Sequence, residues 1–185
     1  SDGYAARMSG ASLRERLSEQ GAPAVLMPGV WDALTARLGA QAGFDTVFLS
    51  GYCVSGTLLG LPDFGYLTQT EMAEVARRVC AANPGLDVVV DADTGYGNPL
   101  NTIRTVELWQ QAGASGMFLE DQVWPKRCGH MAGKQVIERA VRDELHQPRM
   151  LRRFHDWRSR CNRCRRGYGR GRRRRLAEQT WEQFH

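Results

Sequence analysis

Apolar and polar residues follow one another along residues 1–138 in blocks that predict strands and helices in turn. Short apolar runs, which are typical of buried strands, are each followed by a longer segment with apolar residues at helical spacing. Expected strands occupy residues 24–27, 46–49, 86–90 and 116–119, and expected helices occupy residues 12–20, 31–42, 70–80 and 101–112. Because strands that alternate with helices form parallel βαβ units, the pattern predicts an α/β fold. Strands that are apolar along their whole length further predict a sheet covered on both faces.

Helix starts are indicated by capping residues. Ser12, with Glu15 three residues later, has the spacing of a capping box, and Thr70 is a plausible cap for the third helix.

Polar residues follow directly after three of the expected strands. Ser50, Asp91 and Glu120 each stand at the carboxyl end of a strand, with Asp93 and Asp121 close behind. Both a (β/α) barrel and an open α/β sheet bind ligands at this edge, so the pattern leaves the two architectures open. Four βα units amount to about half of a barrel of roughly 250 residues.

The composition fits a globular protein, because 42% of the 185 residues are hydrophobic. No run approaches the roughly 20 apolar residues that cross a bilayer, so no membrane partner is expected. The start of the sequence has no basic flank followed by an apolar core, so no secretory signal is expected. Five unevenly spaced cysteines argue against a disulfide framework and predict a cytoplasmic protein.

The net charge of +5 hides two unlike segments. Residues 1–138 contain 10 basic and 15 acidic residues, whereas residues 139–185 contain 15 arginines, no lysine and 5 acidic residues. We therefore divide the chain at residue 138. A basic segment of this kind often binds nucleic acid or membranes.

Two carboxylates, Asp91 and Asp93, leave the third expected strand with one residue between them. Alternate residues of an extended chain point the same way, so both could bind one hard cation, with water as the remaining ligands. The alternative is an acidic turn that caps the helix after Asn98. The second acidic pair, Glu120 and Asp121, favours the metal site.

Cys128 lies in a polar, basic loop with Lys126 and His130. Basic neighbours lower the pKa of a thiol, which predicts a role in proton transfer. The alternative is an ordinary loop cysteine, and we expect only packing roles for Cys53 and Cys80.

Residues 12–138 resemble the isocitrate lyase/phosphoenolpyruvate mutase superfamily, in its 2-methylisocitrate lyase-like branch. The segments that carry the resemblance are SGY at 50–52, LGLPD at 59–63, DADTGYGN at 91–98 and EDQVWPKRCGH at 120–130. They occur in the family's order and at the family's spacing. The resemblance implies a (β/α)8 TIM-type barrel, of which this chain has roughly the first half, and a tetramer of the full-length protein.

The resemblance also implies a site that binds Mg²⁺, with Mn²⁺ as a possible substitute, and a small carboxylate substrate. The residues it assigns to the metal are Asp91 and Asp93, supported through bound water by Asp63 and Glu120. Those assigned to the substrate are Ser50, Gly51, Tyr52, Asp93 and Gly129. Cys128 matches the family's acid/base cysteine, and Lys126 and His130 match polar residues of its mobile loop.

The implied reaction is cleavage of a carbon–carbon bond in a 2-hydroxy di- or tricarboxylate, such as 2-methylisocitrate, isocitrate or dimethylmalate. The products are pyruvate or glyoxylate and a second carboxylate. The Lys-Arg-Cys-Gly-His loop favours this lyase chemistry, and phosphonomutase-type chemistry, as in carboxyvinyl-carboxyphosphonate phosphorylmutase, is the alternative.

The resemblance ends near residue 138, and the arginine-rich segment that follows has three interpretations. It is a nucleic-acid-binding tail, a metal knuckle built from His155, Cys161 and Cys164, or an out-of-frame translation of a GC-rich gene. Fifteen arginines without a lysine favour the third, which argues against a nucleic-acid partner. In that case the chain is a half-barrel that is inactive as it stands. The second class of function is then a non-catalytic fragment with a basic tail.

Overall fold

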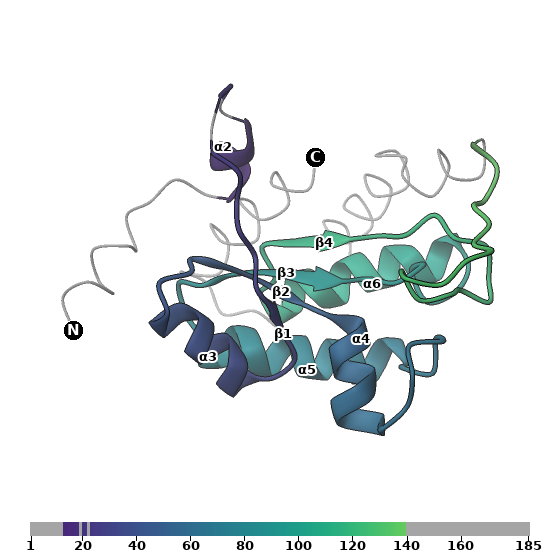
Figure 1. The fold of residues 1–185 in the computed structure, drawn as a ribbon, viewed down its shortest axis with the longest axis horizontal. Coiled ribbons are helices and arrows are strands. Elements are labelled where there is room, and N and C mark those ends of the chain that lie inside the picture. Colours follow the sequence, from purple (N-terminus) through teal and green to yellow (C-terminus); the bar gives the residue numbers. More distant parts are fainter. Residues whose placement is uncertain (1–12, 19, 22, 140–185) are drawn as a thin grey trace, which may run out of the picture.

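The computed structural model describes residues 13–18, 20–21 and 23–139 of the chain (Figure 1). Its elements are α2 (Leu13–Ser18), β1 (Gly29–Val30), α3 (Ala33–Gln41), β2 (Thr46–Leu49), α4 (Gly51–Val54), the π-helix η2 (Ser55–Leu59), α5 (Gln69–Ala82), β3 (Asp87–Asp91), α6 (Pro99–Ala112) and β4 (Gly116–Phe118).

The four strands form one parallel sheet in the order β1-β2-β3-β4, so neighbours along the chain are neighbours in the sheet. The register places Phe48 of β2 opposite Val89 of β3, and Asp91 of β3 opposite Phe118 of β4. The carboxyl ends of the strands therefore lie along one edge, as the strand arrows in Figure 1 show. This confirms the predicted parallel α/β fold.

Helices α3, α5 and α6 form a single layer, because α5 contacts both of the others (Figure 1). Val47 of β2 faces this layer, since its side chain is the nearest neighbour of Gly39 in α3. Such a layer on one side of a parallel sheet is the wall of a barrel, whereas a doubly wound sheet has helices on both faces.

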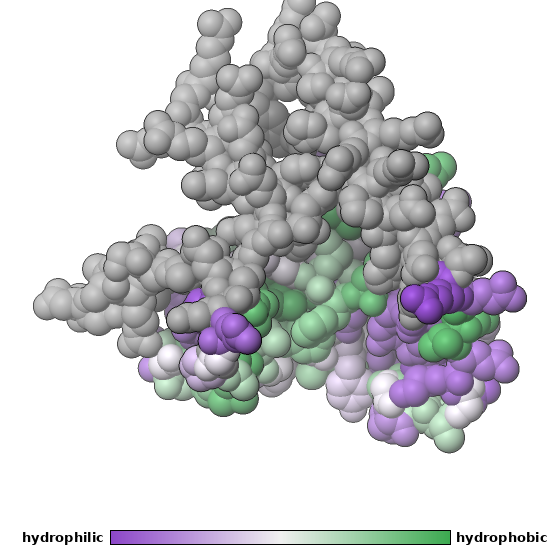
Figure 2. Space-filling view, turned by 90° about the horizontal axis from the view of Figure 1, so that it is seen from above, coloured by the Kyte–Doolittle hydropathy of each residue, from purple (hydrophilic) through white to green (hydrophobic). Residues whose placement is uncertain are grey.

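The opposite face of the sheet carries Phe48 and Phe118, whose ring centroids are 5.3 Å apart. Phe118 is half exposed, and the three long helices leave this face uncovered. In Figure 2, hydrophobic residues are visible in the middle of the face seen from above, with hydrophilic residues on both sides. Leu13 of α2 lies beside Val89 on this face, and both side chains are buried. The expectation of a sheet covered on both faces is therefore met here at Val89 and stays a prediction for the rest of the face.

The core lies between the sheet and the helix layer, and Trp109 of α6 is its largest fully buried side chain. The indole Nε1–H donates a hydrogen bond of 3.2 Å to the main-chain oxygen of Asp91. The indole ring also packs against the ring of Tyr96, with centroids 5.8 Å apart. The core therefore supports the end of β3 from below.

Several element bounds differ from those expected. Strand β2 is confirmed, but the first strand is Gly29–Val30 and not residues 24–27, because main-chain bonds from Phe48 to Pro28 and from Ser50 to Val30 fix the pairing there. Helix α5 is capped by Thr68, two residues before the predicted Thr70. Helices α4 and η2 were not predicted.

The expected Ser12 cap and the segment 140–185, with the possible knuckle of Cys161, Cys164 and His155, lie outside the described residues.

Candidate active site

Asp91 is the last residue of β3, and both oxygens of its carboxylate accept main-chain hydrogen bonds. Oδ2 accepts from the N–H of Gly51 at 3.1 Å, and Oδ1 accepts from the N–H of Asp93 at 2.9 Å. The strand register places Asp91 on the face that carries Phe118, away from the helix layer. The carboxylate is thus held at the carboxyl edge, facing the side that is the interior of a barrel.

Gly51, the first residue of α4, lies against this carboxylate. A Cβ at this position would lie 2.8 Å from Asp91 Oδ2, so only glycine allows the approach. Ser50 caps the helix by accepting from the N–H of Cys53. The N–H of Ser50 donates to Val30, and that of Gly51 donates to Asp91. The N–H of Tyr52 lies in the first turn of α4, where main-chain N–H groups have no acceptor within the helix.

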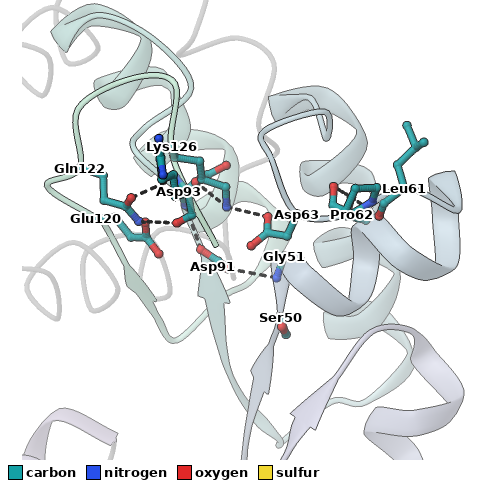
Figure 3. A network of polar contacts seen from close by, with 12 residues as sticks. Ser50, Gly51, Leu61, Pro62, Asp63, Asp91, Asp93, Glu120, Gln122 and Lys126 are labelled. Atoms are coloured by element: carbon teal, nitrogen blue, oxygen red, sulfur yellow. Dashed lines mark hydrogen bonds and ion pairs between the residues drawn. The ribbon is translucent and has the colours of Figure 1, made fainter. Parts of the chain in front are cut away.

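Lys126 joins two further carboxylates (Figure 3). Its Nζ lies 2.7 Å from Asp63 Oδ1 and 2.8 Å from Asp93 Oδ1. All three side chains are largely withdrawn from solvent, with exposed fractions of 3% for Lys126, 12% for Asp63 and 9% for Asp93. Burial opposes the charge on the ammonium, but the two carboxylates outweigh it and raise the pKa of Lys126. The cluster is therefore an ion-paired network that ties three separate segments together.

Asp93 is held in an unusual backbone conformation. Its φ of 51° lies in the left-handed region, which is uncommon for residues other than glycine. Burial raises the pKa of its carboxyl to about 6, although the Lys126 ammonium acts in the opposite direction. Its Oδ1 contacts Lys126 as an ion pair but takes part in no hydrogen bond of good geometry among the described residues. This buried oxygen therefore retains capacity for a further ligand.

Glu120 follows β4 and lies beside the same network. Its N–H donates to the main-chain oxygen of Asp93 at 2.7 Å, and its carboxylate accepts from the side chain of Gln122. Gln122 in turn bonds the main chain of Arg127 in both directions, at 3.0 and 3.1 Å. Glu120 is thus coupled to the loop that carries Lys126 and Cys128.

That loop, residues 120–137, is closed at its base. The N–H of Val123 donates to Gln135, and the N–H of Ile137 donates to Asp121, at 2.8 and 2.9 Å. The ring of Trp124 packs over Gly65, where a Cβ would lie 2.4 Å from the indole. The sequence of this loop resembles the mobile loop of the family. In the structure, its Lys126 meets Asp63 and Asp93 at the carboxyl edge of the sheet.

Cys128 is buried and lines a cavity of about 490 Å³. The other residues that line it are Trp31, Tyr52, Cys53, Gly56, Thr57, Leu61, Pro62, Asp63, Phe64, His130 and Met131. Burial, followed by the neighbouring Asp63, raises the pKa of the Cys128 thiol. The expectation that basic neighbours lower this pKa was wrong, because the Lys126 ammonium is directed at Asp63 and Asp93. The thiol is therefore protonated at neutral pH.

The remaining loop residues lie at the cavity and its margin. His130 lines the cavity with Cys128 and Asp63, so these three predicted residues are brought together. Gly129 is exposed, and its main-chain oxygen accepts from Lys134. Cys53 also lines the cavity, and its expected packing role stays a prediction.

The acidic side chains suit Mg²⁺ by chemical type. No three His, Cys, Asp or Glu side chains of the described residues form a compact metal cage. Mg²⁺ is usually bound by one or two carboxylates and keeps several waters, so it needs no such cage. Asp91 and Asp93 supply hard oxygen donors two residues apart, and Asp93 Oδ1 lacks a hydrogen bond. These residues fit the ion, with Asp63 and Glu120 as outer partners.

Tyr96 is a site residue that the sequence analysis did not single out. Its φ is 62°, and burial, followed by the charges of Asp93, Asp91 and Asp63, raises its pKa. Its ring packs against Trp109, whose indole bonds the main chain at the end of β3. Its place in the segment DADTGYGN, three residues after Asp93, was the available signal.

Comparison with known proteins places the chain in a family. Residues 13–147 match the family model described as phosphoenolpyruvate phosphomutase, beyond the boundary predicted at residue 138. Over 121 residues the chain is 59% identical to the chloroplastic carboxyvinyl-carboxyphosphonate phosphorylmutase of Arabidopsis thaliana, covering 65% of this chain and 35% of that protein. Over 129 residues it is 45% identical to the 2,3-dimethylmalate lyase of Eubacterium barkeri, covering 70% of this chain and 44% of that protein.

Solved structures agree with the sequence relatives. An oxaloacetate acetylhydrolase in complex with 3,3-difluorooxalacetate superposes with a TM-score of 0.72 at 34% identity, covering 80% of this chain and 51% of that one. A 2,3-dimethylmalate lyase superposes with a TM-score of 0.69 at 34% identity, covering 80% and 47%. The chain spans less than half the length of the curated relatives named above.

No helix within the described residues has the length and apolar character needed to span a bilayer.

The geometry of the carboxyl edge, the family model and the relatives lead to one assignment. This chain belongs to the phosphoenolpyruvate phosphomutase family, within the isocitrate lyase/phosphoenolpyruvate mutase superfamily.

Proposed function

We propose that this chain carries the metal-binding half of a Mg²⁺-dependent carbon–carbon lyase. The substrate is a 2-hydroxy di- or tricarboxylate of the 2-methylisocitrate, isocitrate or dimethylmalate type, and the products are pyruvate or glyoxylate and a second carboxylate. The observation that carries the proposal is the position of Cys128, which lines one cavity with Asp63, while Lys126 joins Asp63 to Asp93 just after the end of β3.

Asp91 and Asp93 would hold the cation, with Asp63 and Glu120 acting through bound water. When bound, Mg²⁺ lowers the pKa of a coordinated hydroxyl and stabilises the 2-oxo acid. Gly51 keeps the Asp91 carboxylate in place through its N–H, which leaves the N–H of Tyr52 to bind a substrate carboxylate.

The bond changes balance as a retro-aldol reaction. The 2-hydroxyl gives its proton to water in the site, its carbon becomes the carbonyl of the 2-oxo acid, and the electron pair of the breaking bond passes to the neighbouring carbon. That carbon takes a proton from the Cys128 thiol and becomes part of the carboxylate product, and the thiolate then regains a proton from water. A thiol whose pKa is raised by burial and by Asp63 is suited to the role of general acid.

Lys126 and His130 act in the surroundings of this step. The loop 120–137 covers the edge and helps to exclude water from the carbanion. His130 lines the cavity with Cys128. Gly129, which has no side chain, stands between Cys128 and His130 in the loop.

The competing proposal is phosphonomutase-type chemistry, which the name of the Arabidopsis relative favours. The name of the Eubacterium relative, a 2,3-dimethylmalate lyase, favours the carbon–carbon lyase. We prefer the lyase because the Cys128 thiol supplies the proton that carbon–carbon cleavage requires.

The assembly and location of the full-length protein, and the activity of this chain alone, are also proposals. The full-length protein is proposed to be a cytoplasmic homotetramer, and this 185-residue chain is proposed to be inactive alone, because it spans less than half of its relatives. A non-catalytic fragment with a basic tail is the second class of function.

A full-length version that contains residues 13–138 tests the assigned acid. Replacing Cys128 with serine should lower Mg²⁺-dependent release of pyruvate or glyoxylate by about 100-fold or more, because a serine hydroxyl is a far weaker acid. Cys53→Ser, which removes a thiol from the same cavity but not from beside Asp63, should lower it far less. Equal losses in the two variants would contradict the role of Cys128.

A further inference from the structure

Lys126 puts a positive charge inside the group of carboxylates that we assign to the metal. One ammonium bridges Asp63 and Asp93 at 2.7 and 2.8 Å (Figure 3). A cation bound by Asp93, with Asp63 as an outer partner through water, would lie within a few ångströms of this ammonium. The ammonium and the cation would therefore compete for the negative charge of the same two carboxylates.

The repulsion between the two charges would be strong because the site is buried. The Lys126 side chain is 3% exposed, and its Nζ contacts the carboxylates directly. Like charges a few ångströms apart repel far more in such surroundings than in bulk water. An ammonium on a flexible stem can leave the cluster, since four methylene groups connect it to the backbone.

We propose that the Lys126 ammonium is an internal counter-ion that competes with Mg²⁺ for Asp63 and Asp93, and that it leaves the cluster when the cation binds. The inference rests on the proposed metal site. Lys126 is two residues from Cys128, so its departure would also move the segment that carries the acid thiol. Binding of the cation is in this way linked to the position of the loop.

The same contacts have a simpler explanation, in which Lys126 only fastens the loop to the sheet. In that case its removal would leave the affinity for Mg²⁺ unchanged or weaken it, because the carboxylates would lose their support. The two explanations therefore predict opposite changes in affinity.

The unmodified protein offers the first test, because its sequence contains two lysines, Lys126 and Lys134. Acetylation by acetic anhydride, followed at each lysine by mass spectrometry, should be slow at Lys126 without a divalent cation. Saturating Mg²⁺ should speed acetylation of Lys126 roughly tenfold or more, as expected when a buried side chain opens to solvent. Lys134 serves as the internal reference, because it is already exposed without the cation, and its acetylation should change far less than that of Lys126. No acceleration at Lys126 under conditions where Mg²⁺ binds would overturn the inference.

The second test compares Lys126→Met with Arg127→Met by isothermal titration of Mg²⁺ into the full chain. Both variants lose one positive charge from the same loop, but Arg127 is exposed and its side chain contacts a carbonyl, not a carboxylate. Lys126→Met should bind Mg²⁺ roughly tenfold or more tightly than the original chain, and Arg127→Met should differ by less than about threefold.

The outcomes distinguish a failure of the proposed competition from a failure of the proposed metal site. If the original chain binds Mg²⁺ and Lys126→Met binds it equally or more weakly, the competition is refuted and the metal site stands. If neither protein binds Mg²⁺, the proposed metal site is itself refuted, and the competition with it.

Discussion

Gly51 shows how a residue without a side chain positions a carboxylate. Its main-chain N–H donates to Asp91, and the two residues approach so closely that no Cβ fits between them. The hydrogen bond and the contact together orient the carboxylate before any ligand arrives. The same carboxylate accepts from Asp93, so its orientation is fixed from two sides.

Replacing Gly51 with alanine should therefore lower the free energy of unfolding by about 1–3 kcal/mol, because the added Cβ would push the Asp91 carboxylate away. Urea unfolding followed by circular dichroism measures the effect. Gly56→Ala is the matched control, since a Cβ there meets nothing within 4 Å, and it should change the value by less than about 0.5 kcal/mol. Similar losses in both variants would show that Gly51 has no special contact.

At the scale of elements, helix ends are where the sequence and the structure differ most. The apolar spacing of the chain identified α3, α5 and α6, because periodicity reports a whole face of a helix. Their first residues depend on single hydrogen bonds. In α5 the Thr68 hydroxyl accepts from the N–H of Glu71, and the Glu71 carboxylate accepts from the N–H of Thr68.

Thr68→Ala should consequently cost about 1 kcal/mol of the free energy of unfolding. The exposed Thr70, which the sequence favoured as the cap, should tolerate alanine with a change of less than about 0.5 kcal/mol. Chemical denaturation of the two variants measures both values. A larger loss for Thr70→Ala than for Thr68→Ala would contradict the observed helix start.

Helix α2 is attached to the amino edge of the sheet by Arg16. Its guanidinium contacts Asp45 at 2.6 Å, Asp87 at 3.0 Å and the hydroxyl of Thr46 at 2.7 Å. The hydrogen bond from Arg16 lowers the pKa of Asp45 below its ordinary value of 3.8. A carboxyl with a lowered pKa in the folded state stabilises the fold above its unfolded-state pKa and loses this effect as the pH falls.

Arg16→Gln should thus destabilise the protein by about 0.5–1 kcal/mol at pH 7, in line with a partly exposed ion pair. The difference from the original chain should shrink as the pH falls below about 3.8 and Asp45 takes up its proton. Urea titrations at several pH values measure it. Arg37→Gln, which removes a contact with the main-chain oxygen of Ala82, should show no such pH dependence. A difference that grows with acidity would refute the account.

For the whole molecule, the sequence predicted the alternation of strands and helices and most of the acidic edge. It did not predict the position of β1, because the pairing of Gly29–Val30 with β2 is decided by contacts between segments and not by the apolar run before it. Nor did it predict the pairing of Lys126 with Asp63 and Asp93, which are far from it in the sequence. Local patterns identify functional residue types, while the fold decides which of them meet.

The interpretation of the arginine-rich segment as an out-of-frame translation remains a prediction, because residues 140–185 lie outside the described part of the structure. Reading the source nucleotide sequence in the neighbouring frames should reveal a continuation of the barrel just beyond residue 138. Absence of such a continuation in every frame would favour a genuine basic tail.

The central claim is that this family site breaks carbon–carbon bonds. The most direct measurement is product formation by a full-length version containing residues 13–138, offered substituted malates, isocitrates and phosphonopyruvate in parallel. We predict Mg²⁺-dependent release of pyruvate or glyoxylate from at least one of the malates or isocitrates, and no turnover of phosphonopyruvate. Turnover of phosphonopyruvate with no cleavage of any malate or isocitrate would contradict the claim.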